Sequence, residues 1–247
     1  MENRMLARLL MLAPILFLIG CTKPISHQGG IIHDLILSPS VMEQEEFYWW
    51  SLRFRIAWPR GKPPNWSVGL LLADIVVEPA LVRFHNKVQF WRFHRRAARD
   101  DTGHQFSFIF YSDSSVAGEI IETIKRNEVL DQLLARKLIE EVNTDDMDVP
   151  ARRNIEAMSD PDWSIELQKA WPAFIMGVSA TWLELINQNV GKEEIGDSDL
   201  DGLLKRYDEA NESVGSIWIH EGQHAFFHHL NAIFGYEPVI IRNRINF

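Results

Sequence analysis

Leu52-Arg53-Phe54-Arg55-Ile56-Ala57-Trp58 is the stretch that decides the fold, because apolar and charged side chains alternate along it. Successive side chains of a β-strand point to opposite faces of a sheet, so this period of two predicts a strand with one buried and one solvated face. The turn-rich stretch Pro59–Pro64 ends the strand. A sheet with one face in water is typically antiparallel.

Three further apolar runs extend this pattern through the first half of the chain. Val68–Val77 predicts a more buried strand, Val82–Phe93 alternates again, and Phe106–Phe110 carries a phenylalanine at every second position. Short polar turns separate the runs. We therefore expect four strands that follow one another as an antiparallel meander.

After Tyr111 the apolar period becomes helical. The stripe of apolar residues within 113–142 repeats about every 3.6 positions, as on a helix that buries one face. A second helix is expected from Ser159-Asp160-Pro161 to about Asn187, because a capping residue followed by proline is typical of a helix start. Within it, Ala170–Leu183 has no charged residue and is too short to span a bilayer, so it predicts a central buried helix, and 190–202 predicts a loop.

A third helix is expected over Val214–Phe234, close to the C-terminus. Strands in the first half and helices in the second predict an α+β fold, in which an antiparallel sheet packs against helices from the C-terminal half. The stretch 46–247 is long enough to bury one core without covalent cross-links, so we expect it to form a single domain.

The first twenty residues have the order of a secretory signal. A short basic start with Arg4 and Arg8 precedes the apolar run Leu9–Ile19 and the small residue Gly20. A membrane-spanning helix needs roughly 20 apolar residues, and this run is shorter. Residues 1–20 are therefore expected to be a signal peptide that is removed.

The end of this signal, Leu18-Ile19-Gly20-Cys21, resembles the lipobox of bacterial lipoproteins. The resemblance implies cleavage before Cys21 and acylation of its thiol and amine, so that lipid chains hold the protein on a membrane. Residues 21–45 would then be the lipidated cysteine and a tether. Enterobacterial sorting of lipoproteins depends on whether an aspartate follows the acylated cysteine, and here Thr22 follows Cys21. The resemblance therefore implies an outer-membrane address facing the periplasm. The alternative is an ordinary cleaved signal in which Cys21 is incidental.

Composition narrows the classes of function. The chain has 34 acidic and 25 basic residues, a net charge of −9, so nucleic acid is not an expected partner. Cys21 is the only cysteine, which leaves none for a disulfide or a cysteine metal site once it is acylated.

The basic run Arg92–Arg99 is interpreted as a solvated hairpin tip, or else as a docking site for an acidic partner or lipid headgroups. Nine Trp and 14 Phe indicate an aromatic core or an aromatic recognition patch.

One motif in the sequence is typical of a catalytic metal site. His220-Glu221-Gly222-Gln223-His224 resembles the H-E-x-x-H signature of zincin metallopeptidases. The resemblance implies that His220 and His224, one helical turn apart, bind Zn²⁺ and that Glu221 acts as general base.

Other features depart from that family. Zincins take a third ligand downstream, and Leu230 stands where the nearer histidine would be. Glu237 is the remaining carboxylate before the end of the chain, at an unusually short spacing. Gly222 inside the motif also weakens a helix by about 1 kcal/mol.

Two functions follow from these observations. The favoured one is a noncatalytic lipoprotein that faces the periplasm and binds a protein partner or an envelope component, in a role of the secretion-assembly or toxin-immunity kind. The alternative is a zinc-dependent, peptidase-like hydrolase with Glu221 as base and His220 and His224 as metal ligands, in which Glu237 or an upstream residue supplies the third ligand.

Overall fold

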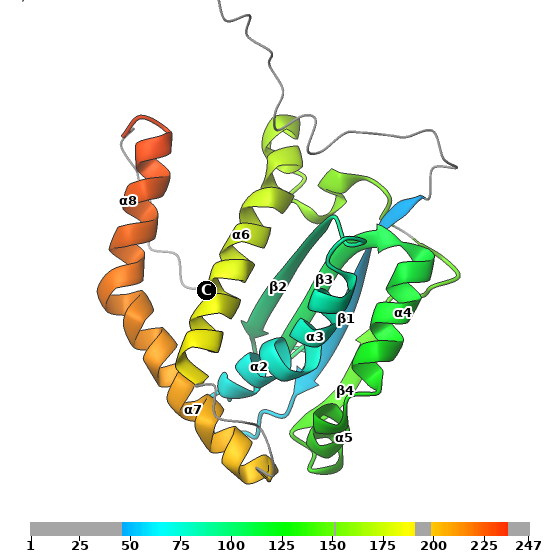
Figure 1. Ribbon diagram of the computed structural model, residues 1–247, viewed down its shortest axis with the longest axis vertical. Helices are drawn as coiled ribbons and strands as arrows, with labels where there is room; N and C mark the ends of the chain where they lie inside the picture. Colours follow the sequence, from blue (N-terminus) through cyan, green and yellow to red (C-terminus); the bar gives the residue numbers. More distant parts are fainter. Residues whose placement is uncertain (1–45, 151, 191–198, 237–247) are drawn as a thin grey trace, which may run out of the picture. The chain divides into compact units, whose positions relative to one another are not determined.

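The computed structural model describes residues 46–150, 152–190 and 199–236. Its centre is a four-stranded antiparallel sheet in the order β2-β3-β1-β4 (Figure 1). The predicted α+β fold is confirmed, with helices from the C-terminal half packed against the sheet. The strands are β1 (Phe47–Ile56), β2 (Phe90–Ala97), β3 (His104–Asp113) and β4 (Ile139–Thr144).

The alternation in β1 decides which side chains enter the core. Leu52 and Phe54 are fully buried and lie opposite Phe108 and Phe106 of β3. Arg53, between them, points to the other face of the sheet. Each of these pairs removes apolar surface from water, which is the main favourable contribution to folding.

Helices cover the apolar face of the sheet, as Figure 1 shows. A continuous helical segment joins β1 to β2, and a helical pair follows β3. The first segment consists of α2 (Ser67–Leu71), the π-helical turn η1 (Leu72–Val77) and α3 (Glu78–Phe84), and the pair is α4 (Ser114–Lys125) and α5 (Glu128–Ala135).

The rest of the chain lies beside β2, against α2, and on the other face of the sheet. The long helix α6 (Ile165–Val190) packs against β2, and α7 (Leu200–Ile217) continues through a second π-helical segment, η3 (Trp218–Gly222), into α8 (Gln223–Ile233). The short 3₁₀ helix η2 (Ile155–Met158) packs on the other face of the sheet. In the described ranges no helix has the length and apolar character needed to cross a membrane.

Both edges of the sheet are protected. At β2, the backbone N–H of Phe93 donates to the hydroxyl of Ser179 on α6 at 3.0 Å, and that hydroxyl donates to the carbonyl of Ile175 at 2.8 Å. At the other edge, β4 is six residues long and exposes Glu140 and Glu141. Charged residues and short length are common features of edge strands.

Two predicted strands are wrong. Val68–Val77 is helical, and Val82–Phe93 holds the end of α3 and the start of β2. The meander is wrong too, because β1 pairs with β3 and β4 while β2 lies at the edge. Val68–Val77 lies between the sheet and other helices, so nearly every side chain in it is buried and the period that distinguishes a helix is lost.

The helix predicted over 113–142 is broken. Asp113 caps α4 by accepting from Val116 N at 2.9 Å, but a new cap follows at Asn127, whose side chain accepts from Val129 N at 3.0 Å and starts α5. Lys137 has φ 57°, a left-handed conformation that ends the helical run. Val142 therefore lies in β4.

The later helices also differ from the prediction. Helix α6 begins at Ile165, later than expected, and the central part of it is not fully buried: within Ala170–Leu183, Pro172, Ser179 and Leu183 alone are buried. The expected loop 190–202 partly lies outside the described residues, and α7 begins at Leu200 inside that range. The third helix starts earlier than Val214 and contains the π-helical segment η3.

Candidate binding groove

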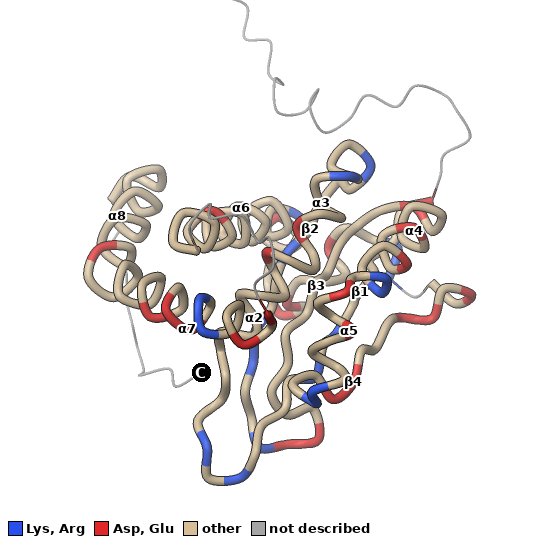
Figure 2. The backbone as a smooth tube through the Cα atoms, turned by 60° about the horizontal axis from the view of Figure 1, so that its bottom comes forward, with Lys and Arg blue, Asp and Glu red and all other residues tan. Residues whose placement is uncertain are grey.

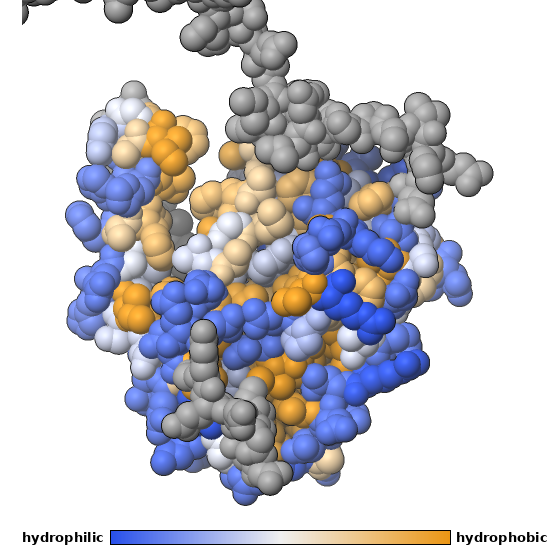
Figure 3. All heavy atoms as spheres, viewed as in Figure 1, coloured by the Kyte–Doolittle hydropathy of each residue, from blue (hydrophilic) through white to orange (hydrophobic). Residues whose placement is uncertain are grey.

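An apolar groove of about 890 Å³ lies between α6 and the α7–η3–α8 arm. Figure 3 shows hydrophobic side chains along the sides of α6 and α8 that face one another. Figure 2 shows that α8 and the middle of α6 carry almost no charged residues. The uncharged stretch of α6 that predicted a buried helix thus lines a groove.

Large apolar side chains on the groove walls are partly open to solvent. Phe174 and Val178 of α6 are 44% and 46% exposed, and Trp218 and Phe227 of the facing arm are 41% and 58% exposed. Single exposed apolar residues are ordinary, but a continuous apolar patch is typical of a binding surface.

Gly222 shapes one wall of the groove. It is buried inside η3, and a Cβ at this position would lie 3.2 Å from the Trp218 ring and 3.5 Å from the Phe226 ring. These two rings lie with their centroids 6.3 Å apart. A glycine at this place therefore allows the two aromatic side chains to pack over the π-helical segment.

Arg95 of β2 lies at the floor of the groove. Its guanidinium carbon is 4.9 Å from the ring centroids of both Trp66 and Trp182, a double cation–π contact. One nitrogen, Nη2, donates to the carbonyl of Trp66 at 2.8 Å, whereas buried Nε has no hydrogen-bond partner among the described residues. Burial lowers the pKa of Arg95 to about 10, so the side chain is still charged at neutral pH.

The basic run Arg92–Arg99 does not lie on one surface. Because side chains alternate along β2, Arg95 faces the groove side, and Arg92, His94 and Arg96 face the other side of the sheet. Arg96 pairs with Asp100 at the hairpin turn. The hairpin tip is present, but the run as a whole is divided between the two faces.

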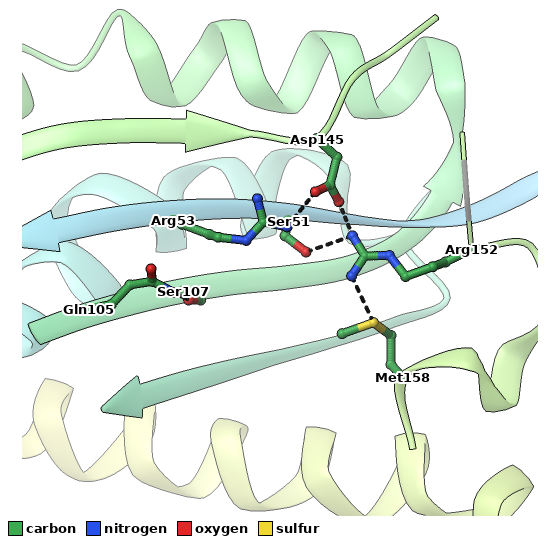
Figure 4. A network of polar contacts seen from close by, with 7 residues as sticks. All are labelled: Ser51, Arg53, Gln105, Ser107, Asp145, Arg152 and Met158. Atoms are coloured by element: carbon green, nitrogen blue, oxygen red, sulfur yellow. Dashed lines mark hydrogen bonds and ion pairs between the residues drawn. The ribbon is translucent and has the colours of Figure 1, made fainter. Parts of the chain in front are cut away.

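A polar network occupies the face of the sheet opposite the helices (Figure 4). Asp145 accepts from both Arg53 and Arg152, one on each carboxylate oxygen. Arg152 also donates to the hydroxyl of Ser51 at 3.2 Å and to the sulfur of Met158 at 3.1 Å. Arg152 therefore fixes the segment after β4 onto the sheet.

The H-E-x-x-H residues lie on the arm. His220 and Glu221 fall in η3, His224 falls in α8, and all three are exposed. The ring of His224 lies near that of His228, with centroids 5.6 Å apart. Within 46–150, 152–190 and 199–236, no three His, Cys, Asp or Glu side chains come together as a metal site. Glu237 and Cys21 lie outside these ranges, so their roles remain predictions.

Sequence reasoning missed two buried basic residues. One is Arg95, which alternation would have placed beside Trp91 and Phe93 if the start of β2 had been known. The other is His104, which is 1% exposed, lies between Trp58 and Trp66, and has no hydrogen-bond partner in the described part of the chain. Burial lowers the pKa of His104 to about 4, and the positive charge of Arg95 adds to this effect.

Comparison with known proteins leaves the family open. No protein-family model matches the chain, and no curated protein matches it. Among solved structures, it is similar to the crystal structure of TsrL, at 15% sequence identity over 75% of this chain and 55% of that chain, with a TM-score of 0.36. This chain thus spans little more than half the length of TsrL, and a likeness of this degree carries no argument about function.

Proposed function

We propose that the protein is a lipid-anchored binding protein of the bacterial envelope, which holds the apolar part of an envelope component or partner in the groove between α6 and the α7–η3–α8 arm. The observation that carries this proposal is the row of exposed aromatic and aliphatic side chains on both walls of the groove. Their exposure is unfavourable in water and is relieved when a ligand covers them.

The polar groups of the groove favour binding over catalysis. Ser179 and Thr181 both donate their hydroxyl hydrogens to helix carbonyls, at 2.8 and 2.9 Å. Among the described lining residues, no histidine or carboxylate lies beside either hydroxyl to activate it as a nucleophile. A few polar groups within a mostly apolar lining are typical of ligand pockets.

The anchor and the charge are consistent with this role. A lipid on Cys21 would hold the domain at a membrane surface, where apolar envelope components are present. The net charge of −9 disfavours nucleic acid as the ligand. Roles in secretion assembly or toxin immunity both require such a binding domain, and either would use the groove.

Binding of the neutral fluorescent dye Nile red tests the proposal. Every described element lies after residue 45, so a chain that lacks residues 1–21 retains them all. We expect saturable binding that the Val178→Arg substitution weakens at least tenfold, because a guanidinium would enter the apolar groove.

A matched control is Val82→Arg, which changes a valine that is 65% exposed on α3, outside the groove. It should leave dye binding unchanged. Absence of saturable binding to the unmodified chain, or equal weakening by both substitutions, would reject the groove as the binding site.

A further inference from the structure

We infer that the groove selects a long-chain carboxylate, with the acyl chain between α6 and α8 and the carboxylate on the guanidinium of Arg95. This inference rests on the proposed function, since it names the class of ligand that the same groove would hold. It goes further because it assigns a negative charge to the ligand and names Arg95 as the residue that binds this charge.

In the part of the chain that the structure describes, the charge of Arg95 is not balanced by a neighbouring carboxylate. Within the described ranges no carboxylate forms an ion pair with it, although eight other ion pairs are present there. The rings of Trp66 and Trp182 both stabilise the cation, but they do not neutralise it. A partly buried charge without a counterion is strongly unfavourable, and an anionic ligand would remove that penalty.

The guanidinium of Arg95 also has hydrogen-bond donors available for a ligand. A guanidinium has five N–H donors in a fixed planar arrangement, and in Arg95 the described partner is the carbonyl of Trp66 alone. The double contact with the Trp66 and Trp182 rings holds the plane in one orientation. A carboxylate matches a planar guanidinium with two parallel hydrogen bonds, so the site is prepared for this group.

The rest of the described groove lining is uncharged. Arg95 is the one charged side chain among the described residues that line the groove, and the other lining residues include Val178, Trp218 and Phe227. One cation at the floor suits one negative group, and the long apolar walls suit an unbranched hydrocarbon. An extended peptide is disfavoured, because its backbone N–H and C=O groups would meet few partners there.

Displacement of Nile red by palmitate and by 1-hexadecanol tests the inference. The two molecules share a chain of sixteen carbons and differ in the charge of the head group. Both are added below the concentration at which they form aggregates. We expect palmitate to compete at a concentration at least tenfold lower than 1-hexadecanol.

The same comparison is then made in two variants. Arg95→Met keeps the length of the side chain and removes its charge, so the preference for palmitate should disappear while Nile red still binds. Arg96→Met changes the neighbouring arginine on the opposite face of the sheet and should keep the preference.

Each outcome has a distinct meaning. Equal competition by the two ligands in the unmodified chain overturns the inference without any variant, so a folding defect in Arg95→Met cannot hide a failure. A palmitate preference that survives in folded Arg95→Met overturns it as well. Failure of Nile red to bind rejects the proposed function itself, whereas Nile red binding without a carboxylate preference rejects this inference alone and leaves a neutral lipid or a protein segment as occupant.

Discussion

The phenol of Tyr207 donates a hydrogen bond to the carboxylate of Asp74 at 2.5 Å and so joins α7 to the π-helical turn η1. Tyr207 is fully buried, and burial raises its pKa well above the usual range, with the hydrogen bond to Asp74 as the second cause. The phenol is therefore neutral at neutral pH and acts as a hydrogen-bond donor to Asp74. The contact therefore holds the middle of α7 against η1.

Tyr207→Phe should destabilise the fold by about 1–3 kcal/mol, because it removes a donor and leaves a carboxylate without its partner. Urea unfolding followed by circular dichroism measures the change. Tyr236→Phe is the control, since Tyr236 is 61% exposed at the end of the arm and should change stability by less than about 0.5 kcal/mol. Equal stability of Tyr207→Phe and the unmodified chain would contradict the role given to this bond.

His104 should make stability depend on pH. Its pKa is about 4 in the folded chain against 6.5 for an ordinary histidine, so the unfolded state binds more protons between these values. Stability is then fully present above pH 6.5 and falls as the pH drops toward 4, by about 1–3 kcal/mol. His104→Leu should flatten this part of the profile, and His85→Leu, an exposed control, should not. Urea unfolding at a series of pH values measures the difference.

Gly222→Ala should act on the groove more than on stability. The added Cβ would lie 3.2 Å from the ring of Trp218, which must move by a few tenths of an ångström. Since Trp218 is partly exposed, it can shift, and alanine favours a helix by about 1 kcal/mol, so the net change in stability should be small. Nile red affinity should fall several-fold. Gly118→Ala in α4, where a Cβ meets nothing within 4 Å, should leave that affinity unchanged.

The anchor can be tested at Cys21. Growth with radiolabelled palmitate should label the protein in the membrane fraction, and Cys21→Ser should abolish both the label and the membrane association. An ordinary cleaved signal would instead give an unlabelled, released protein from the unmodified gene, which would remove the anchor from the proposal.

The zinc alternative has its own measurement. Because the described residues bring no third ligand to His220 and His224, we expect much less than one zinc per chain by mass spectrometry, in a preparation without a histidine tag. His220→Ala combined with His224→Ala should change this little, as should His229→Ala. One zinc per chain that the double variant alone loses would restore the hydrolase hypothesis.

Secondary structure was predicted most accurately from the sequence for elements that have one buried face and one face in water. The alternation of Leu52, Arg53 and Phe54 placed β1 correctly because it reports directly on the two faces of the sheet. Prediction from periodicity failed for Val68–Val77. This segment is buried on all sides, so its apolar residues show no helical period. Periodicity also failed at Val142, whose spacing continues a helical stripe although the cap at Asn127 and the turn at Lys137 interrupt the chain.

The groove was beyond prediction from the sequence for a related reason. The uncharged run Ala170–Leu183 is compatible both with a helix that packs on a core and with a helix that lines a groove, since both require the same types of residue. That distinction depends on where the α7–η3–α8 arm lies relative to α6, and contacts between residues far apart in the sequence, such as Tyr207 with Asp74, help to hold α7 in place. Arg95 could be assigned to the groove only after the start of β2 was known.

The contact of Ser179 with Phe93 has a consequence for neighbouring molecules. A membrane surface concentrates anchored chains in two dimensions, where an open strand edge would recruit the edge of the next copy and begin aggregation. Here the hydroxyl of α6 already occupies a donor of β2, and the two glutamates of β4 repel their counterparts on another molecule. If Cys21 carries the proposed lipid, many copies would therefore stand side by side on one membrane without joining through the edges of their sheets.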